Sequence, residues 1–293
     1  MAGISVIIPT LNAGATLDGL LAAVRAQSLP SEIVVIDSAS SDDTLEIARR
    51  YEAKIIPIKR RDFRHGSARS VAGKAAAGDI LVYLTQDALP MDTQAIEQLI
   101  VPLQTDDQIG ATYGRQVAAP GASPFATHLR AFNYPAHSCV KSLEDCARLG
   151  MRTAFISNAF SAYRRSVLSA MGWFKEGLMM GEDVQMGARL LLAHYRIAYV
   201  AKAQVYHAHN YTLAQEFRRY AQIGAFHRQE DWMLREFGKS EGEGLRYAQS
   251  ELRYLARHRQ HYLMPLSLLR NGLKYAGYSW GRWGGEQVRA QKT

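Results

Sequence analysis

Polar segments follow three apolar, strand-like runs in the N-terminal half of the chain. The carboxyl ends of parallel strands meet at one edge of a sheet, so these segments are expected to converge on one ligand site. There Asp37 can accept a hydrogen bond from a base N–H or a ribose hydroxyl, although an aspartate in this position can also form a turn or cap a helix. The polar segments are PTLN (residues 9–12), DSAS (37–40) and TQDA (85–88).

Two adjacent acids, Glu182 and Asp183, begin a helical pattern over residues 182–194. A carboxylate placed beside a hydroxyl nucleophile can take its proton as a general base. Two acids in the first turn of a helix also complement the helix dipole without any chemical role. The spacing alone leaves both interpretations open.

Two histidines, His207 and His209, lie two residues apart in a strand-like segment. Side chains alternate along a strand, so both are predicted to lie on the same face. They either contribute to a site or lie on a solvated edge strand.

The elements that must position these residues alternate between strand and helix, which predicts an α/β fold with a mostly parallel, doubly wound sheet and helices on both faces. Strands are predicted at residues 4–8, 33–36, 54–58 and 80–84, then at 110–117, 154–157, 196–200 and 203–207. Helices are predicted at residues 15–27, at about 44–51, and at 67–77, 92–103 and 182–194. From residue 213 the pattern is helical, with breaks at 238–244 and at Pro265. We therefore predict one α/β domain over residues 1–210 and a helical extension over 211–293.

The composition is that of a folded protein. Of the 293 residues, 47% are hydrophobic and 21% are charged, which supports a substantial core and excludes wholesale disorder. The two cysteines, Cys139 and Cys146, give neither a disulfide framework nor a zinc pattern. The sequence begins almost at once with a strand and has no leader-like segment and no long apolar run, so we expect a cytoplasmic protein without a membrane span.

The segments IIPTLN (residues 7–12) and VIDSASSDDT (35–44) resemble the opening of family-two glycosyltransferases with the GT-A fold. The resemblance implies a Rossmann-like sheet that binds a nucleotide-sugar donor, with Thr10 and Asp37 at its base and ribose. The nucleotide-sugar site predicted in this way comprises Pro9, Thr10, Asn12, Asp37, Ser40, Arg69, Gln86 and Asp87.

The segment HGSARS (residues 65–70) is similar to a Gly-x-x-Arg-Asn sequence of that family, with Ser70 in place of the asparagine. A helix N-terminus and an arginine together form an anion site. We therefore expect Arg69 to help bind the diphosphate; the alternative is a tight turn with an exposed arginine.

TQDA stands where the family carries an Asp-x-Asp metal motif, with Thr85 replacing the first acid. The leaving nucleoside diphosphate accumulates negative charge, which calls for a divalent cation, and Mg²⁺ or Mn²⁺ can use one carboxylate with phosphate and water. The resemblance implies Asp87 and His207 as the metal ligands.

The segment Gly181-Glu182-Asp183 matches the Glu-Asp motif of the same family. An inverting transfer needs a carboxylate to take the acceptor's proton. The resemblance therefore implies that Asp183 is the catalytic base and that Glu182 supports or orients it.

TQDA, FNYP (residues 132–135), FISN (155–158) and NYT (210–212) resemble the bacterial rhamnosyltransferase subgroup. This implies transfer of L-rhamnose from dTDP-L-rhamnose to a hydroxyl of a lipid-linked saccharide acceptor of a bacterial surface glycan. A different donor such as a UDP-hexose, or a catalytically silent nucleotide-sugar-binding protein, remains an alternative. A nucleotidyltransferase would carry a glycine-rich, basic N-terminal loop, which residues 9–14 lack.

The formal net charge of +8 is concentrated at the end of the chain, where residues 245–293 contain nine Lys or Arg against two acids, interleaved with seven Tyr or Trp. Such a composition suits peripheral contact with the inner-membrane surface. A solvated helical face and a homodimer contact are the alternatives. Nucleic acid is not an expected partner, because no recognition module accompanies the charge.

Overall fold

A single mixed sheet forms the centre of the protein in the computed structural model, which describes residues 3–207, 209–238 and 242–284. Its nine strands within these residues run in the order β3-β2-β1-β4-β8-β6-β9-β5, and β7 pairs with β9. The strands are β1 (Ile4–Thr10), β2 (Glu32–Asp37), β3 (Lys54–Pro57), β4 (Ile80–Leu84), β5 (Leu89–Pro90), β6 (Ile109–Val117), β7 (Cys139–Lys141), β8 (Phe160–Arg164) and β9 (Arg196–Tyr206).

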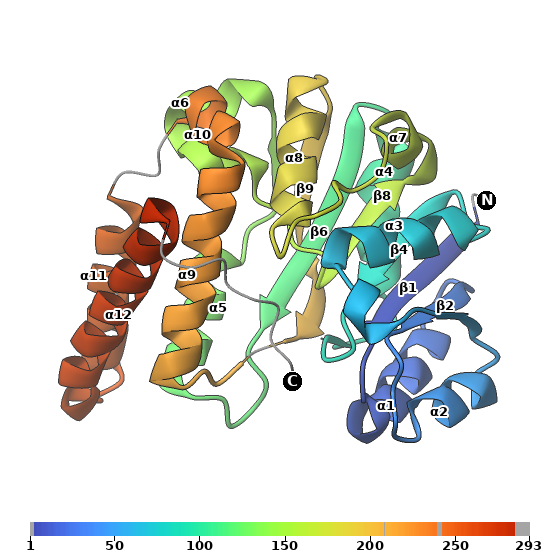
Figure 1. Cartoon of the computed structure of the whole chain (residues 1–293), viewed down its shortest axis with the longest axis horizontal. Coiled ribbons are helices and arrows are strands. Elements are labelled where there is room, and N and C mark those ends of the chain that lie inside the picture. Colours follow the sequence, from blue (N-terminus) through green and yellow to red (C-terminus); the bar gives the residue numbers. More distant parts are fainter. Residues whose placement is uncertain (1–2, 208, 239–241, 285–293) are drawn as a thin grey trace.

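Helices cover both faces of the sheet, and four of them form the C-terminal extension (Figure 1). The α-helices are α1 (Gly14–Arg25), α2 (Thr44–Arg50), α3 (His65–Ala75), α4 (Ala95–Thr105), α5 (Pro124–Asn133), α6 (Cys146–Leu149), α7 (Arg165–Ala170), α8 (Glu182–Leu192), α9 (Leu213–Gln229), α10 (Asp231–Phe237), α11 (Glu243–Arg257) and α12 (Met264–Trp283). Short 3-10 helices are η1 (Arg60–Asp62), η2 (Leu143–Asp145), η3 (Gly150–Ala154) and η4 (His261–Leu263). Among the described residues no helix is both long enough and apolar enough to cross a bilayer.

Strand direction agrees with the prediction of a mostly parallel sheet. Strands β1 to β4 pair in parallel, and β6 pairs in parallel with β9. Strand β8 lies antiparallel between β4 and β6, so both of those strands run in the same direction as β1. The mostly parallel, Rossmann-like sheet is therefore confirmed, and the carboxyl ends of its main strands share one edge.

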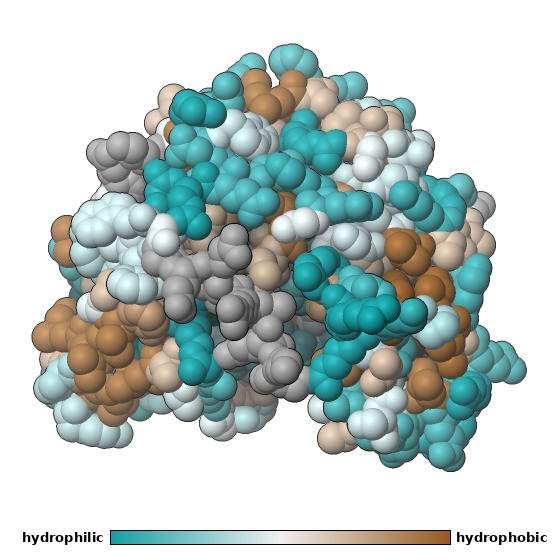
Figure 2. All heavy atoms as spheres, in the orientation of Figure 1, coloured by the Kyte–Doolittle hydropathy of each residue, from teal (hydrophilic) through white to brown (hydrophobic). Residues whose placement is uncertain are grey.

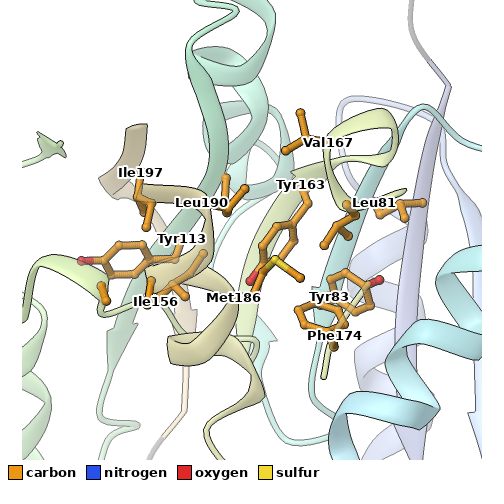
Figure 3. Close-up of a cluster of buried hydrophobic side chains, with 14 of the residues drawn as sticks. Leu81, Tyr83, Tyr113, Ile156, Tyr163, Val167, Phe174, Met186, Leu190 and Ile197 are labelled. Carbon is orange, nitrogen blue, oxygen red and sulfur yellow. The ribbon is translucent and has the colours of Figure 1, made fainter. Parts of the chain in front are cut away.

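The apolar strands are buried on both faces, as their continuous hydrophobic runs predict. Val6 and Ile8 of β1 pack with the side chains of α1, α2 and α4, whereas Ile7 points to the opposite face, covered by α3, α7 and α8. On that second face the rings of Tyr83 and Phe174 meet edge to face, with 5.3 Å between their centroids (Figure 3). The side chains packed on the two faces of the sheet fix the positions of its strands.

The structure differs from the predicted strands in two places. Residues 154–157 were expected to form a strand, but η3 ends at Ala154 and β8 begins only at Phe160. Ile156 is nevertheless buried, so a short apolar run here marks a buried loop rather than a strand. The strands expected at 196–200 and 203–207 are one strand, β9, interrupted by a shift in its register with β6 between Gly114 and Arg115.

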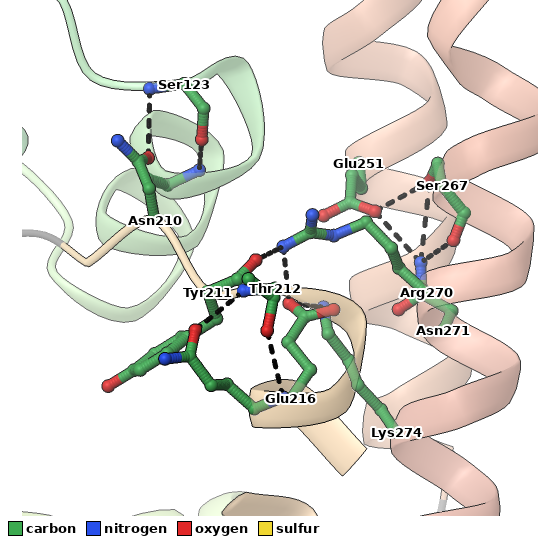
Figure 4. Close-up of polar contacts among 12 residues, drawn as sticks. Ser123, Asn210, Tyr211, Thr212, Glu216, Glu251, Ser267, Arg270, Asn271 and Lys274 are labelled. Carbon is green, nitrogen blue, oxygen red and sulfur yellow. Dashed lines mark hydrogen bonds and ion pairs between the residues drawn. The ribbon is translucent and has the colours of Figure 1, made fainter.

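The predicted helical extension is confirmed, although the domain boundary after residue 210 stays a prediction. Helix α12 packs along α9, and Pro265 lies in the first turn of α12 rather than breaking it, a position that a proline tolerates. Buried polar contacts join α11 to α12, where the Glu251 carboxylate accepts hydrogen bonds from Ser267 Oγ at 2.6 Å and Asn271 Nδ2 at 2.9 Å (Figure 4).

Glycines allow the close approach of α12 to α9. A Cβ atom on Gly281 would lie 2.0 Å from the carbonyl oxygen of Ala221, and one on Gly277 would lie 2.4 Å from that of Phe217. Backbone atoms cannot move aside as a flexible side chain can, so the two helices are in contact only because these positions lack side chains.

We expect Gly281→Ala to lower the free energy of unfolding by about 1–3 kcal/mol, because the added methyl group forces α12 away from α9. The matched control is Gly272→Ala on the same helix, where no atom lies within 4 Å of the added Cβ. That substitution should be neutral or stabilise by up to about 1 kcal/mol through helix propensity. Chemical denaturation measures the free energy of unfolding of the two variants. Equal values would contradict the close contact between α9 and α12 at Gly281.

Candidate active site

A cavity of about 1300 Å³ opens at the carboxyl edge of the sheet and is bounded on its other side by the extension. Its wall includes residues from β1, from the loop after β4, from the start of α8 and from α9 and α12. Of the residues predicted for the site, the lining contains Pro9, Thr10, Arg69, Gln86, Asp87, Glu182, Asp183 and His207. Segments from β1 to α12, near the two ends of the described chain, thus meet around one space.

Asp37 lies directly behind the cavity wall. Its carboxylate is buried and accepts hydrogen bonds from Thr10 Oγ1 at 2.9 Å and from the Ser40 backbone N–H at 2.9 Å. Asn12 has a φ of 49° and ties the loop after β1 to that after β2, because its backbone N–H donates to Ser40 Oγ. Asp37, Ser40 and Asn12 therefore hold Thr10 in place and are not themselves part of the lining.

Gln86 joins the ends of β1 and β4. Its Oε1 accepts the backbone N–H of Leu11 at 2.9 Å, and its Nε2 donates to the Leu11 carbonyl at 3.3 Å. This double contact fixes the orientation of the amide. The two polar segments predicted to converge are thereby bonded to each other.

The acid pair begins α8 after Gly181, whose φ of 78° suits glycine. The Glu182 carboxylate is only 4% exposed and accepts a hydrogen bond from Arg69 Nη1 at 2.7 Å. Arg69 is equally buried, so the alternative of an exposed arginine in a turn is wrong. The guanidinium faces the cavity with its charge already balanced by Glu182.

Asp183 occupies a different environment from its neighbour. It stays partly exposed in the cavity wall, and its carboxylate accepts hydrogen bonds from the backbone N–H of Asn158 at 3.1 Å and of Val184 at 2.8 Å. Burial, followed by the negative charge of Glu182, raises the pKa of Asp183 to about 6 despite those hydrogen bonds. A carboxylate with this pKa is ionised at neutral pH yet accepts a proton readily.

Three side chains on the cavity wall could hold a metal ion. Asp87, His207 and His209 each offer a ligand atom, and these atoms all lie within 4.8 Å of one another. His207 Nε2 is 3.4 Å from Asp87 Oδ1, and His209 Nε2 is 3.5 Å from Asp87 Oδ2. The side chains of both histidines therefore point toward Asp87, and the alternative of two histidines on a solvated edge strand does not hold.

Gln116 determines which nitrogen of His207 faces Asp87. Arg130 Nη1 is 2.7 Å from Gln116 Oε1, and because an arginine only donates, the atom it meets must be the amide oxygen. That oxygen also lies 2.8 Å from His207 Nδ1, which must then carry the hydrogen. In a neutral His207 the lone pair of Nε2 points at the Asp87 carboxylate, and a cation between the two satisfies both. The donor set therefore fits a divalent cation.

Several residues of the site were not among those predicted from the sequence. Gln116 lies at the end of β6, and nothing in its sequence context indicates a functional role. Asn158 belongs to the FISN segment, and it lies buried behind the wall, where its Nδ2 donates a hydrogen bond to Glu182 Oε1 at 3.3 Å. Arg130 and Arg219 also line the cavity.

The charges of these two arginines reach the metal-ligand cluster. Burial, together with the charges of His207, Arg130 and Arg219 and against the opposing effect of Asp87, lowers the pKa of His209 to about 4. Arg130 and Arg219 thus add positive charge to the cavity wall near His209.

Comparison with known proteins identifies the family. Residues 5–172 match the profile described as glycosyl transferase family 2, which covers more than half of the chain. The chain belongs to this family. It is therefore a glycosyltransferase, and the resemblance inferred from the two N-terminal segments is confirmed.

Two relatives of this family 2 glycosyltransferase match almost its whole length. The O-antigen chain rhamnosyltransferase WbaN of Salmonella anatum is 41% identical over 285 residues, which cover 96% of this chain and 90% of the relative. The O-antigen chain rhamnosyltransferase RfbN of Salmonella typhimurium is 40% identical over 282 residues, which cover 95% of this chain and 89% of that relative. The match extends through the helical extension, so that part is shared with these relatives.

Solved structures confirm the GT-A fold of this family 2 enzyme. The mannosyltransferase PcManGT from Pyrobaculum calidifontis, in complex with GDP-Man and Mn²⁺, superposes with a TM-score of 0.65 at 18% identity, covering 97% of this chain and 88% of that one. S. aureus TarS 1-349 in complex with UDP-GlcNAc superposes with a TM-score of 0.56 at 16% identity, covering 99% of this chain and 94% of that one. At such low identity the likeness concerns the fold and not the substrate.

We expect Asp87→Asn to weaken Mn²⁺ binding by at least about tenfold, because the substitution removes the only charged ligand of the cluster. Gln116→Leu should weaken it as well, by about tenfold or more, through loss of the hydrogen bond that orients His207. Loss of the electron paramagnetic resonance signal of free Mn²⁺ measures binding directly. Asp79→Asn, at the opposite end of β4, is the control, and equal binding by Asp87→Asn and the control would rule out this cluster.

Proposed function

We propose that the enzyme is an inverting rhamnosyltransferase that moves L-rhamnose from dTDP-L-rhamnose to a hydroxyl of a saccharide acceptor. The identity of about 40% with two proteins named O-antigen chain rhamnosyltransferases, over nearly the full length of each, supports the choice of sugar. The proposed acceptor is a lipid-linked, growing surface glycan, and the proposed place of action is the cytoplasmic face of the inner membrane.

One observation carries the mechanism: Asp183 is the acid of the pair that is free to react. Glu182 is held in a buried ion pair with Arg69, whereas Asp183 has a raised pKa and access to the cavity. We assign Asp183 as the general base. Glu182 contributes as a fixed negative charge that keeps the pKa of Asp183 high.

The proposed step is a single displacement. The acceptor oxygen attacks the anomeric carbon from the face opposite the diphosphate, and the bond between that carbon and the diphosphate oxygen breaks. The dTDP leaves with the electron pair of that bond, and the hydroxyl proton passes to Asp183. A β-linked donor thereby yields an α-L-rhamnosyl product.

The nucleotide side of the cavity is assigned from the contacts at the strand ends. We assign Pro9, Thr10 and Gln86 as direct neighbours of the nucleotide. Asp37, Ser40 and Asn12 act by positioning Thr10 and the loop that follows it, since their side chains are used in bonds within the protein.

The diphosphate is assigned to the Asp87 side. Asp87, His207 and His209 would hold Mg²⁺ or Mn²⁺, which when bound neutralises the charge developing on the leaving group. Arg69 was expected to bind the diphosphate. Because its charge is paired with Glu182, we assign it only a secondary contribution to diphosphate binding.

Arg130 and Arg219 are better placed for the phosphate groups. Both line the cavity, both affect His209, and neither has a carboxylate partner within the described part of the chain.

A panel of sugar nucleotides tests the donor. Purified enzyme is incubated with dTDP-L-rhamnose, UDP-glucose, UDP-GlcNAc or GDP-mannose, each with Mg²⁺ or Mn²⁺, and release of the nucleoside diphosphate is measured with and without acceptor. We expect dTDP-L-rhamnose to be used at least about tenfold better than the others. Preference for a UDP-hexose would overturn the choice of sugar, and a thermal shift without any turnover would indicate a silent binding protein.

Asp183→Asn should lower kcat by about 10²–10⁴-fold with little change in donor affinity, because it removes the proton acceptor but keeps the shape of the side chain. Glu176→Gln, an exposed acid a few residues earlier, is the control and should behave as the wild type.

The pH dependence provides a second test of this base. Asp183 must be ionised to accept a proton and its pKa is raised to about 6, so turnover should be constant at higher pH and fall as the pH drops through about 6. The expected slope below that point is about tenfold per pH unit. If turnover does not decline between about pH 7 and about pH 5, while the enzyme stays folded over this range, the assignment of Asp183 as the base is contradicted.

A further inference from the structure

The basic residues of α12 point into the protein. Arg270 Nη2 lies 2.7 Å from Glu216 Oε1 and Lys274 Nζ 3.8 Å from the same oxygen (Figure 4). Arg282 Nη1 lies 3.1 Å from Asp231 Oδ1. The positive charge that the sequence places on this helix is thus largely used to hold α12 against α9 and α10. It is not presented to the exterior.

The outward positions of α12 carry no charge. Across this helix, all of whose residues are described, the exposed side chains recur at helical spacing and are those of Pro265, Leu268, Leu269, Gly272, Tyr275, Ala276, Trp280 and Trp283. Tyr275 is 76% exposed and Trp283 90% exposed. Figure 2 shows a hydrophobic area over the part of the surface where α11 and α12 lie. A contiguous apolar face of this kind on a soluble domain indicates a binding surface.

The neighbouring helix adds positive charge beside this face. On α11, which packs against α12, the exposed side chains include Arg246, Arg253 and Arg257, and none of them forms an ion pair with another described residue. The two acids of α11 are not available, because Glu243 is paired with Arg152 and Glu251 is fully buried. The outer surface of the helix pair is therefore apolar and cationic.

We propose that the outer face of α12 docks onto an anionic lipid surface, with its leucines in the acyl boundary, its Tyr and Trp rings at headgroup level and the arginines of α11 against lipid phosphates. Aromatic side chains favour this interface, and basic residues beside it are attracted to anionic headgroups. The proposal deepens the proposed function, on which it rests for a lipid-linked acceptor.

A second copy of the chain fits this face less well. In a two-fold symmetric dimer each patch meets its own copy, so the uncompensated arginines of α11 would approach each other, and neither acid of the described helix α11 is free to lie between them. Anionic phosphates complement those arginines instead. Charge thus favours lipid over self-association.

Docking by α12 also fits the position of the cavity. Lys274 on the inner side of α12 and Glu216 on α9 line the cavity, while Leu268 and Trp280 lie on the outer side of α12. A surface that binds the outer side therefore lies one helix away from the site where an acceptor must enter.

Vesicle co-sedimentation tests the docking face with the full-length enzyme. Wild type should bind vesicles of phosphatidylcholine mixed with phosphatidylglycerol, and the double variant Leu269→Glu/Trp280→Glu should bind at least about tenfold more weakly. Both positions are exposed, so the fold should be kept. The matched control is Val101→Glu/Val140→Glu, two similarly exposed valines outside the extension, which should bind as the wild type does.

Two further measurements identify the contact. Brominated lipids should quench tryptophan fluorescence in the wild type but not in Trp280→Phe/Trp283→Phe, which keeps Trp173 and Trp232. Arg253→Glu/Arg257→Glu should weaken binding only to vesicles that contain phosphatidylglycerol, and added salt should have the same effect.

The outcomes separate this proposal from the proposed function. Equal vesicle binding by wild type and Leu269→Glu/Trp280→Glu overturns the docking face. A wild-type dimer that the same variant dissociates, with no binding to vesicles, overturns it in favour of self-association. Turnover with a water-soluble acceptor in the absence of vesicles should be unchanged in this variant. Vesicle binding is measured without any donor, so its result does not depend on which sugar nucleotide the donor panel selects.

Discussion

The buried ion pair between Arg69 and Glu182 is the interaction on which the active site depends. It joins the second turn of α3 to the first turn of α8 at 2.7 Å, and each charge would be costly to bury without the other. The pair fixes Glu182 beside Asp183, whose pKa is raised first by burial and then by the negative charge of Glu182, against the lowering effect of Arg69. Two adjacent acids thereby acquire different chemical properties from their surroundings alone.

Hydrogen-bonded contacts between strand ends and helices hold two clusters of functional groups in and behind the cavity wall. Gln116 links Arg130 to His207 and orients the imidazole toward Asp87, while Asn158 links Glu182 and Asp183. The first cluster carries metal-ligating atoms, and the second carries a carboxylate that can accept a proton. The proposed displacement uses both clusters, because the leaving group and the incoming hydroxyl lie on opposite faces of the reacting carbon.

Much of this arrangement was predictable, because it rests on local signals. Apolar runs followed by polar segments gave the strand ends, and the IIPTLN and VIDSASSDDT segments identified the family and placed Thr10 and Asp37 at one edge of the sheet. Residues 154–157 were not predictable as a loop, since a short apolar run looks the same in a buried strand and a buried turn. The charge of α12 was also misleading, because composition does not reveal which side of a helix meets an acidic neighbour.

The sequence by itself determined the family, the alternation of strands and helices, and the types of group available for chemistry. Only the tertiary structure decided that Asp37 is a support rather than a wall residue, that Arg69 belongs to Glu182, and that α12 turns its cations inward and its rings outward. The physical reason is that propensity and periodicity act between residues close in the chain. Ion pairing, burial and the pKa shifts they cause act between residues that meet only after folding.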